Sequence, residues 1–442
     1  MRKTTAIILA VLLLLTVFVS CNHEEIVDEA FTFTITFRGN DPAFDETAIQ
    51  KIGKGIPIEL RDNALKREGY VLVGWNSETD GSGTSYTNGQ RVSFDGDITL
   101  YAKWAIALTS ETTTLTDGNA YSFDRDIVNE NRMTVTGNVT LILLDGYTLT
   151  STQGITVNEG NNLTIDVIGN GTGALNAFAK DPKVDGNQLN RNAAIGGEQN
   201  YGSGLITING GTVNATSETF GAAIGGGQKG IGTVTINGGT VNATAGVYGA
   251  AIGGGHQGNG TVTINGGTVN ATSETYGAAL GGGGVGYGFI VINGGTVNAT
   301  AGNHGAAVGG GWGGGCGSIV VNGGTITATS GLNGAAIGYG YTGPGGGTVV
   351  INGGTVTATA GKNGAGIGGC YDGPGVNVTI NGGQVLAIGG SNVSTIGIGR
   401  GRGDGGNGNL ILGEGVSLLV SSDNTNWSTY DGTTRQRYMK TN

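Results

Sequence analysis

The sequence predicts an all-β protein dominated by a parallel β-solenoid, and three observations lead to that prediction. The phrase Ile-Asn-Gly-Gly-Thr-Val-Asn-Ala-Thr, or a close variant, recurs with spacings of 28, 28, 28, 29, 30 and 29 residues. A fixed period in this range indicates one structural unit stacked on itself. Within each unit apolar residues alternate with polar ones, as in strands, and each interior glycine would cost a helix about 1 kcal/mol. The Asn-Gly-Gly landmarks begin at Asn209, Asn237, Asn265, Asn293, Asn322, Asn352 and Asn381.

Composition excludes several other classes of protein. The chain has 442 residues, which is enough for more than one domain. It contains 92 glycines but only 5 prolines and no strict Gly-X-Y period, so it is not a collagen. Its net charge of −10 argues against a nucleic-acid partner, because phosphates are bound by Lys and Arg.

The repeat over residues 232–260 illustrates the predicted unit. Val234 and Ile236 share one face of its first strand, and Asn237 begins a turn whose glycines tolerate positive φ. Strands are expected at residues 233–236, 240–244 and 249–255. Three strands and three turns make one coil, so we expect about ten rungs at ~4.8 Å each, and a right-handed coil is the preference for parallel crossovers. The Asn column suits a ladder of side-chain amides.

The N-terminus has the pattern of a secretion signal. Arg2 and Lys3 precede an apolar run over residues 7–19, which is shorter than the ~20 residues that a membrane span needs. The run ends in Phe18-Val19-Ser20-Cys21, which resembles a bacterial lipobox. The resemblance implies that residues 1–21 are a lipoprotein signal peptide and that Cys21 becomes lipidated. The alternative is plain secretion, in which Cys21 is incidental.

Residues 22–30 form an acidic tether, and Cys21-Asn22-His23-Glu24-Glu25 resembles the surface-export signal of Bacteroidetes lipoproteins. This resemblance implies an outer-membrane anchor with display at the cell surface. Contact with the membrane would then be through the lipid alone.

Residues 31–104 lack the repeat period and are predicted to be a separate module. An alternating strand opens it at 31–37, and a helix is expected near 45–51. Two of its phrases, Gly69-Tyr70…Gly74-Trp75 and Asp97-Ile-Thr-Leu-Tyr101-Ala-Lys-Trp104, resemble the Listeria–Bacteroides repeat, which is the B-repeat of listerial internalins. The resemblance implies a small β-grasp-like fold with a spacer or adhesive role. Trp75, Tyr101 and Trp104 could contact a ligand, but the alternation around them favours core packing.

The repeat domain is expected to cover residues 107–435. Degenerate copies begin it, residues 180–191 form a polar insertion, and residues 410–420 are expected to be a last copy. Cys316 and Cys370 lie two rungs apart, which is too far for a disulfide, so both are expected to be separate buried or loop thiols.

Positions that vary between near-identical repeats indicate where a ligand could bind. Four residues after the aliphatic residue of each third strand lies a column that contains Gln228, His256, Gly284, Trp312, Tyr341, Tyr371 and Arg402. Aromatic rings surrounded by glycines suit the apolar faces of sugars, and Asp372 could add a polar contact. The candidate ligand-binding residues are therefore Trp312, Tyr341, Tyr371, Asp372, His256 and Arg402. The alternative is that these rings lie flat on the rod and shield its edge.

A second column, just before the third strand, contains Phe220, Tyr248, Tyr276 and His304, and its regular spacing indicates a structural stack. The outward threonines of the second strand also resemble an ice-binding array, but Asn interrupts that array and Thr is an ordinary strand residue.

Catalysis is not predicted, because no rung places two carboxylates together. The acidic residues of the irregular early rungs and of a late loop could hold calcium or contact a uronate, although no spacing specifies a site. Those residues are Asp145, Asp166, Asp185 and Asp404.

Residues 140–435 resemble the carbohydrate-binding β-helix proteins of gut bacteria and clostridia through their Ile-Asn-Gly-Gly-Thr-Val and Gly-Ala-Ala-Ile-Gly-Gly-Gly phrases. The resemblance implies a non-catalytic cell-surface protein that binds a polysaccharide or a host glycan. Two alternatives stay open: a structural adhesin or stalk whose partner is a protein, and a degenerate polysaccharide lyase.

Overall fold

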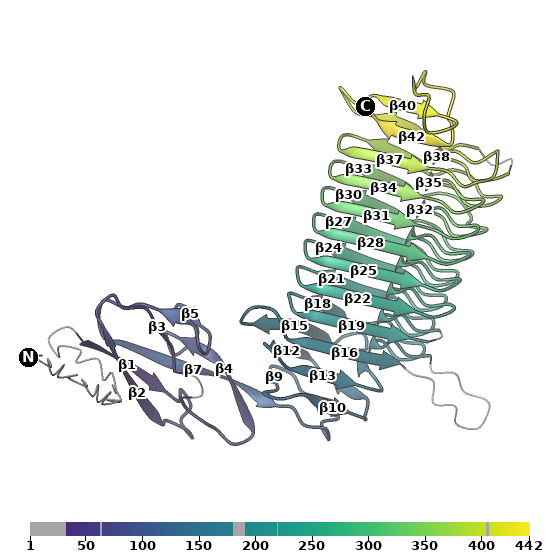
Figure 1. The fold of residues 1–442 in the computed structure, drawn as a ribbon. Helices are drawn as coiled ribbons and strands as arrows, with labels where there is room; N and C mark the ends of the chain where they lie inside the picture. The colour runs from purple at the N-terminus through teal and green to yellow at the C-terminus, as the bar shows by residue number, and fades with distance from the viewer. Residues whose placement is uncertain (1–31, 62–63, 180–190, 219, 404–405) are drawn as a thin grey trace, which may run out of the picture.

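The computed structural model describes residues 32–61, 64–179, 191–218, 220–403 and 406–442. It contains a small N-terminal β region followed by a β-solenoid of about nine turns, close to the ten rungs that the period predicts (Figure 1). The signal peptide, Cys21 and the acidic tether lie outside the described residues. Across the described part of the chain, no helix has the length and apolar character required to cross a bilayer.

Each turn of the solenoid contributes one strand to each of three long parallel sheets. The first sheet contains β9 (Ala120–Ser122), β12 (Asn138–Leu144), β15 (Asn162–Ile168), β18 (Leu205–Ile208), β21 (Gly232–Ile236), β24 (Gly260–Ile264), β27 (Gly288–Ile292), β30 (Ser318–Val321), β33 (Thr348–Ile351), β36 (Asn377–Ile380) and β39 (Leu410–Leu412). The second contains β10 (Ile127–Asn129), β13 (Thr148–Ser151), β16 (Ala174–Ala179), β19 (Thr212–Ser217), β22 (Thr240–Ala245), β25 (Thr268–Ser273), β28 (Thr296–Ala301), β31 (Thr325–Thr329), β34 (Thr355–Thr359) and β37 (Gln384–Ile388). The third contains β8 (Thr114–Leu115), β11 (Met133–Val135), β14 (Ile155–Thr156), β17 (Ile195–Gly196), β20 (Ile224–Gly225), β23 (Ile252–Gly253), β26 (Leu280–Gly281), β29 (Val308–Gly309), β32 (Ile337–Gly338), β35 (Ile367–Gly368) and β38 (Ile398–Gly399).

Register in these sheets follows the repeat, so identical side chains stack in columns. Ile236 pairs with Ile264 in the first sheet, and Val241 pairs with Val269 in the second. The inward aliphatic residues of all three sheets form one continuous core along the rod. The two cysteines of the described residues, Cys316 and Cys370, are free and buried, as predicted.

The Asn-Gly-Gly turns form the predicted amide ladder. In each turn the Asn Nδ2 donates to the Asn Oδ1 of the turn before, at 2.7–2.8 Å. The ladder joins Asn209, Asn237, Asn265, Asn293, Asn322, Asn352 and Asn381.

The third sheet has a strict requirement for glycine. Gly281 has φ +129°, and a Cβ atom built on it would lie 2.1 Å from the carbonyl oxygen of Gly309 in the next turn. Only glycine permits this approach of one backbone to another.

The N-terminal region is also built of strands. These are β1 (Thr32–Arg38), β2 (Thr47–Gly53), β3 (Ile58–Glu59), β4 (Tyr70–Asn76), β5 (Ser85–Tyr86), β6 (Arg91–Val92) and β7 (Ile98–Ala107). The helix expected near residues 45–51 is wrong, because β2 pairs antiparallel with all seven residues of β1. The two strands form a hairpin, and its pairing outweighs the weak helical pattern of residues 45–51. Trp75 is fully buried against Phe37, with ring centroids 4.6 Å apart, as core packing predicts.

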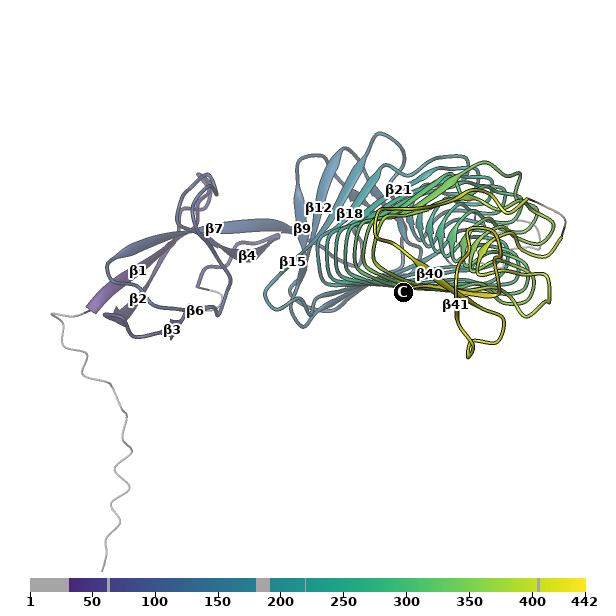
Figure 2. The same ribbon diagram turned by 90° about the horizontal axis from the view of Figure 1, so that it is seen from above.

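One strand runs from the N-terminal region into the solenoid (Figure 2). β7 pairs with β1 and β4 through residues 98–106, and its last residues, Ile106 and Ala107, pair with β9. Val71, Val73 and Ala105 are buried beside the outward face of the first solenoid strands. The boundary expected near residues 104–107 therefore falls inside a continuous strand, and no flexible linker separates the two parts.

The C-terminal end of the rod is closed by an antiparallel cap. Residues 410–420 were expected to form a further copy, but only β39 continues the parallel stack. The chain then forms β40 (Leu418–Ser421), β41 (Ser428–Thr429) and β42 (Tyr438–Thr441), and β42 pairs antiparallel with β37. Arg435 donates to the carbonyls of Asn407 and Gly408 at 3.0 Å, so the cap satisfies backbone groups that another turn would otherwise bind.

Candidate functional site

Two files of side chains run side by side along the loops that flank the third sheet. We call the residues just before each third strand the inner file. Phe220 stacks on Tyr248 at 5.0 Å, Tyr248 on Tyr276 at 4.8 Å, and Tyr276 on His304 at 5.2 Å. Their ring planes differ by only 5–14°, so the rings stack face to face along the rod. Because the neighbours cover these faces, the inner file is a structural stack, as its spacing predicts.

Beyond His304 the inner file continues with amides. Asn333 Nδ2 lies 3.1 Å from His304 Nδ1, Asn363 donates to Asn333 at 2.6 Å, and Asn392 donates to Asn363 at 2.7 Å. The stacked rings are therefore followed directly, on the next turns, by a second ladder of side-chain amides.

The outer file contains the candidate residues that the sequence singles out after each third strand. Each backbone N–H of this file donates to the carbonyl of the inner-file residue one turn earlier. The donor and acceptor pairs are Gln228 to Arg191, His256 to Phe220, Gly284 to Tyr248, Trp312 to Tyr276, Tyr341 to His304, Tyr371 to Asn333 and Arg402 to Asn363, at 2.7–3.0 Å. The main chain thus places the outer file beside the inner file at every turn.

Rings of the outer file are oriented differently from those of the inner file. Trp312 is tilted by 59° to Tyr276, Tyr341 by 41° to His304, and Tyr371 by 50° to Tyr341. All three outer rings are half-buried. A ring tilted by this much is not covered by a parallel neighbouring ring.

Charged side chains mark both ends of the two files. The guanidinium of Arg402 lies 5.1 Å over the ring of Tyr371, and that of Arg191 lies 5.6 Å over the ring of Phe220, both within cation–π range. Asp372 is exposed, and its backbone N–H donates to the carbonyl of Arg402 at 2.7 Å. The structure therefore brings Asp372 and Arg402 to the same end of the outer file as Tyr371.

His256 is separated from the other outer rings by Gly284. It contacts the inner file instead, with its ring 4.7 Å from Tyr248 and 5.5 Å from Phe220. Burial lowers the pKa of His256 and that of His304 below the ordinary value of 6.5, so both imidazoles are neutral at pH 7.

The acidic residues considered for calcium do not converge in the described part of the chain, where no group of three or more His, Cys, Asp and Glu side chains could hold a metal ion. Asp185 and Asp404 lie outside the described residues. Burial alone would raise the pKa of Asp145, but hydrogen bonds from the backbone of Asn170 and Thr172 outweigh burial and lower it. The Asp145 carboxylate therefore already accepts hydrogen bonds from the backbone N–H groups of Asn170 and Thr172.

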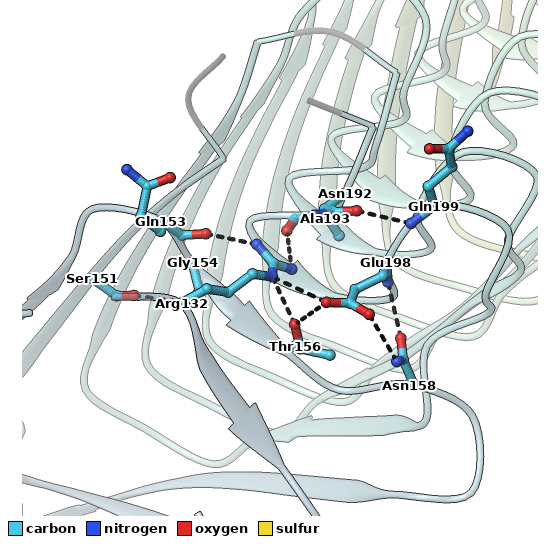
Figure 3. A network of polar contacts seen from close by, with 10 residues as sticks. All are labelled: Arg132, Ser151, Gln153, Gly154, Thr156, Asn158, Asn192, Ala193, Glu198 and Gln199. Carbon is cyan, nitrogen blue, oxygen red and sulfur yellow. Dashed lines mark hydrogen bonds and ion pairs between the residues drawn. The ribbon is translucent and has the colours of Figure 1, made fainter. Parts of the chain in front are cut away.

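Sequence reasoning missed a partly buried polar network in the early turns (Figure 3). The Arg132 guanidinium donates to Thr156 Oγ1 at 2.6 Å, to the carbonyl of Gln153 at 2.6 Å and to that of Ala193 at 2.9 Å, and its Nε lies 4.0 Å from Glu198. Burial lowers the pKa of Arg132 to about 10, while Glu198 raises it, so the guanidinium stays charged at neutral pH. No sequence signal marks this network, because the groups that accept hydrogen bonds from Arg132 lie 21 to 61 residues away from it.

A concave site lies where the N-terminal region meets the solenoid. Its lining includes Arg67, Tyr70, Trp104, Asp145 and Tyr147. Arg67 already lies 3.6 Å over the Tyr70 ring and forms an ion pair of 2.9 Å with Asp41. The Arg67 guanidinium and the Asp145 carboxylate therefore already have partners within the protein.

Comparisons with known proteins agree with this architecture. Residues 33–103 match the Listeria-Bacteroides repeat domain. Six segments match a beta helix repeat, at residues 206–228, 234–256, 262–284, 290–312, 319–338 and 349–371. The chain therefore carries a surface-repeat domain followed by beta-helix repeats.

Part of the chain is also similar to a protein of Evansella cellulosilytica that is described as a Gly-rich membrane protein. It is 32% identical over 130 residues, which cover 27% of this chain and 15% of the relative. The match thus spans less than a sixth of that protein's length. No solved structure matches the chain significantly.

Proposed function

We propose that this chain is a non-catalytic protein of the cell surface that binds a glycan on the outer file of its solenoid. One observation carries the proposal: Trp312, Tyr341 and Tyr371 are half-buried, tilted away from their neighbours and placed on successive turns. Flat apolar rings flanked by the exposed polar groups of Asp372 and Arg402 suit sugars, which combine apolar ring faces with a polar rim.

Surface display is the second part of the proposal. Cys21 would carry the lipid anchor in the outer membrane, and the Listeria-Bacteroides repeat domain would separate the solenoid from that anchor. The continuity of β7 across the junction supports this role. One unbroken strand joins the N-terminal domain to the solenoid, which suits a domain that acts as a spacer.

The test is a glycan array probed with the full chain, followed by affinity measurements on the glycans that bind. Replacing Trp312, Tyr341 or Tyr371 by alanine should in each case weaken binding by about 5- to 150-fold, since a stacked ring contributes about 1–3 kcal/mol with its buried area. Phe289→Ala is the matched control, because this ring is 41% exposed but lies on β27 and not in the outer file. An array without signal would reject the proposal.

Running the array once with calcium and once with a chelator tests whether glycan binding depends on calcium. A signal on acidic polysaccharides that the chelator removes would support a calcium site. Cleavage of uronate polymers in the same samples would favour the degenerate lyase over a binding protein.

A protein partner is the second candidate, and exposed apolar side chains favour it. Val285, Tyr287 and Phe289 alternate along one turn and are 44%, 37% and 41% exposed. Exposed apolar patches of this kind often mark contacts with other proteins. If a protein ligand is found, Phe289→Ala should weaken its binding and Trp312→Ala should not, which is the reverse of the expectation for a glycan.

A further inference from the structure

Four successive positions of the outer file lie in a row parallel to the axis of the rod. Trp312, Tyr341, Tyr371 and Arg402 occupy equivalent positions on consecutive turns, and each is fixed by the same backbone hydrogen bond to the inner file. The turns are stacked directly above one another, as Figure 1 shows. A ligand that contacts several of these side chains must therefore run along the rod and not around it.

Spacing in this row is set by the parallel sheets. Consecutive turns advance by ~4.8 Å, and the centroids of Tyr341 and Tyr371 lie 5.6 Å apart. One sugar residue of a fully extended chain covers a similar length. A helical or strongly bent chain would leave the row after one or two rings.

Glycines border much of the row. Gly311 and Gly313 flank Trp312, Gly340 precedes Tyr341, and Gly373 follows Asp372, whereas the exposed Thr342 follows Tyr341. A row bordered mainly by small residues can accept the interior of a long chain, whereas a closed pocket would select a chain end.

The row is bounded at both ends. Arg402 lies over Tyr371 at 5.1 Å, so the last turn offers a cation in place of a ring. Before Trp312 the row is interrupted by Gly284, over which His256 leans: a Cβ atom at Gly284 would lie 3.0 Å from His256 Cδ2. Only three ring positions and one charged position are therefore contiguous.

From these observations we propose that the outer file binds an internal stretch of a linear, extended β-linked glycan that runs parallel to the rod. One sugar residue lies on each turn, with three stacked on Trp312, Tyr341 and Tyr371 and a fourth beside Arg402. This proposal rests on the glycan-binding function proposed above and adds the shape, the direction and the length of the ligand.

The experiment measures the affinity of the full chain for cello-oligosaccharides of two to six residues by calorimetry. These are extended β-1,4-linked chains with flat apolar faces. Affinity should rise by about tenfold or more from two to four residues as further rings are covered, and by less than about twofold from four to six. Malto-oligosaccharides of the same lengths are the control, because their α-1,4 linkages give a curved chain. They should bind at least about tenfold more weakly at four residues.

Adding one ring to the outer file tests whether each turn binds one sugar residue. Gly284→Tyr restores a ring in the gap, and the backbone at Gly284 is outside the left-handed region. The nearest atoms to its Cβ would be His256 Cδ2 at 3.0 Å and Tyr248 Cδ1 at 3.5 Å, so the His256 ring must shift by a few tenths of an ångström. In this variant the plateau should shift from four to five sugar residues, while Gly284→Ala should leave it at four.

The outcomes separate this proposal from the function on which it rests. Binding that depends on Trp312 but does not change with chain length, or that favours the curved chains, overturns the extended-chain proposal and leaves the glycan-binding function standing. The same holds if other glycans of the array bind and cello-oligosaccharides do not. A chain that binds no glycan at all overturns both.

Discussion

The backbone N–H of Trp312 donates a 2.7 Å hydrogen bond to the carbonyl oxygen of Tyr276, one turn earlier in the solenoid. The two rings lie 5.7 Å apart and are tilted by 59°. Because the main chain and not ring packing fixes this pair, either ring can be removed without displacing the backbone of the other. Stability and ligand binding should therefore be separable by mutation.

Removing an inner ring should cost more stability than removing an outer ring. Tyr276 stacks between Tyr248 and His304, so Tyr276→Ala loses two stacked pairs and should lower the free energy of unfolding by about 2–3 kcal/mol. Trp312→Ala leaves the inner stack intact and should cost less than about 1.5 kcal/mol. Urea unfolding of the two variants measures the difference. Equal losses would contradict the division into a structural and a ligand-binding file.

The amide ladder predicts a difference between its interior and its end. Asn293 donates to Asn265 and accepts from Asn322, whereas Asn209 only accepts, from Asn237. Asn293→Ala should cost about 1–2 kcal/mol and Asn209→Ala about half as much, since each exposed bond contributes about 0.5–1 kcal/mol. Thermal unfolding compares the two. If both variants lose the same stability, the ladder bonds do not contribute as the structure implies.

Periodic features of this fold could be predicted from the sequence, because each turn packs on a near copy of itself. Once the Asn-Gly-Gly period is known, the columns of core residues, the amide ladder and the two files follow by counting. The column that contains Trp312, Tyr341 and Tyr371 was found in this way, and in the structure Tyr341 contacts Tyr371 while Arg402 lies over the Tyr371 ring.

Features that occur only once could not be predicted in the same way. The strand at Thr47–Gly53 is stabilised by its pairing with β1, and local propensity does not report that partner. The C-terminal cap reverses strand direction where the repeat pattern still continues. Arg132 donates hydrogen bonds to groups up to 61 residues away, for which a single sequence carries no signal.

The Arg132 network gives a third prediction. Arg132→Lys keeps the charge but cannot reproduce the planar fork that reaches Thr156 and the carbonyls of Gln153 and Ala193. Partly buried carbonyls left without a donor should cost about 1–3 kcal/mol. Arg125→Lys, at an exposed position on a nearby turn, is the control and should change stability by less than about 0.5 kcal/mol. Chemical denaturation measures both, and a neutral Arg132→Lys would show that the network is dispensable.

The two described histidines should make the solenoid less stable in mild acid. Burial lowers the pKa of His256 and His304 below 6.5, so on acidification the unfolded chain takes up protons first. Their contribution to stability is complete above pH 6.5 and is lost as the pH falls toward the lowered folded values. Melting temperatures at pH 7.5 and pH 5 should therefore differ for the native chain. The double variant His256→Gln, His304→Asn should lose this difference, since Asn at 304 still accepts from Asn333. If the melting temperature of that variant still differs between pH 7.5 and pH 5 by the same amount, a group other than the two histidines is responsible.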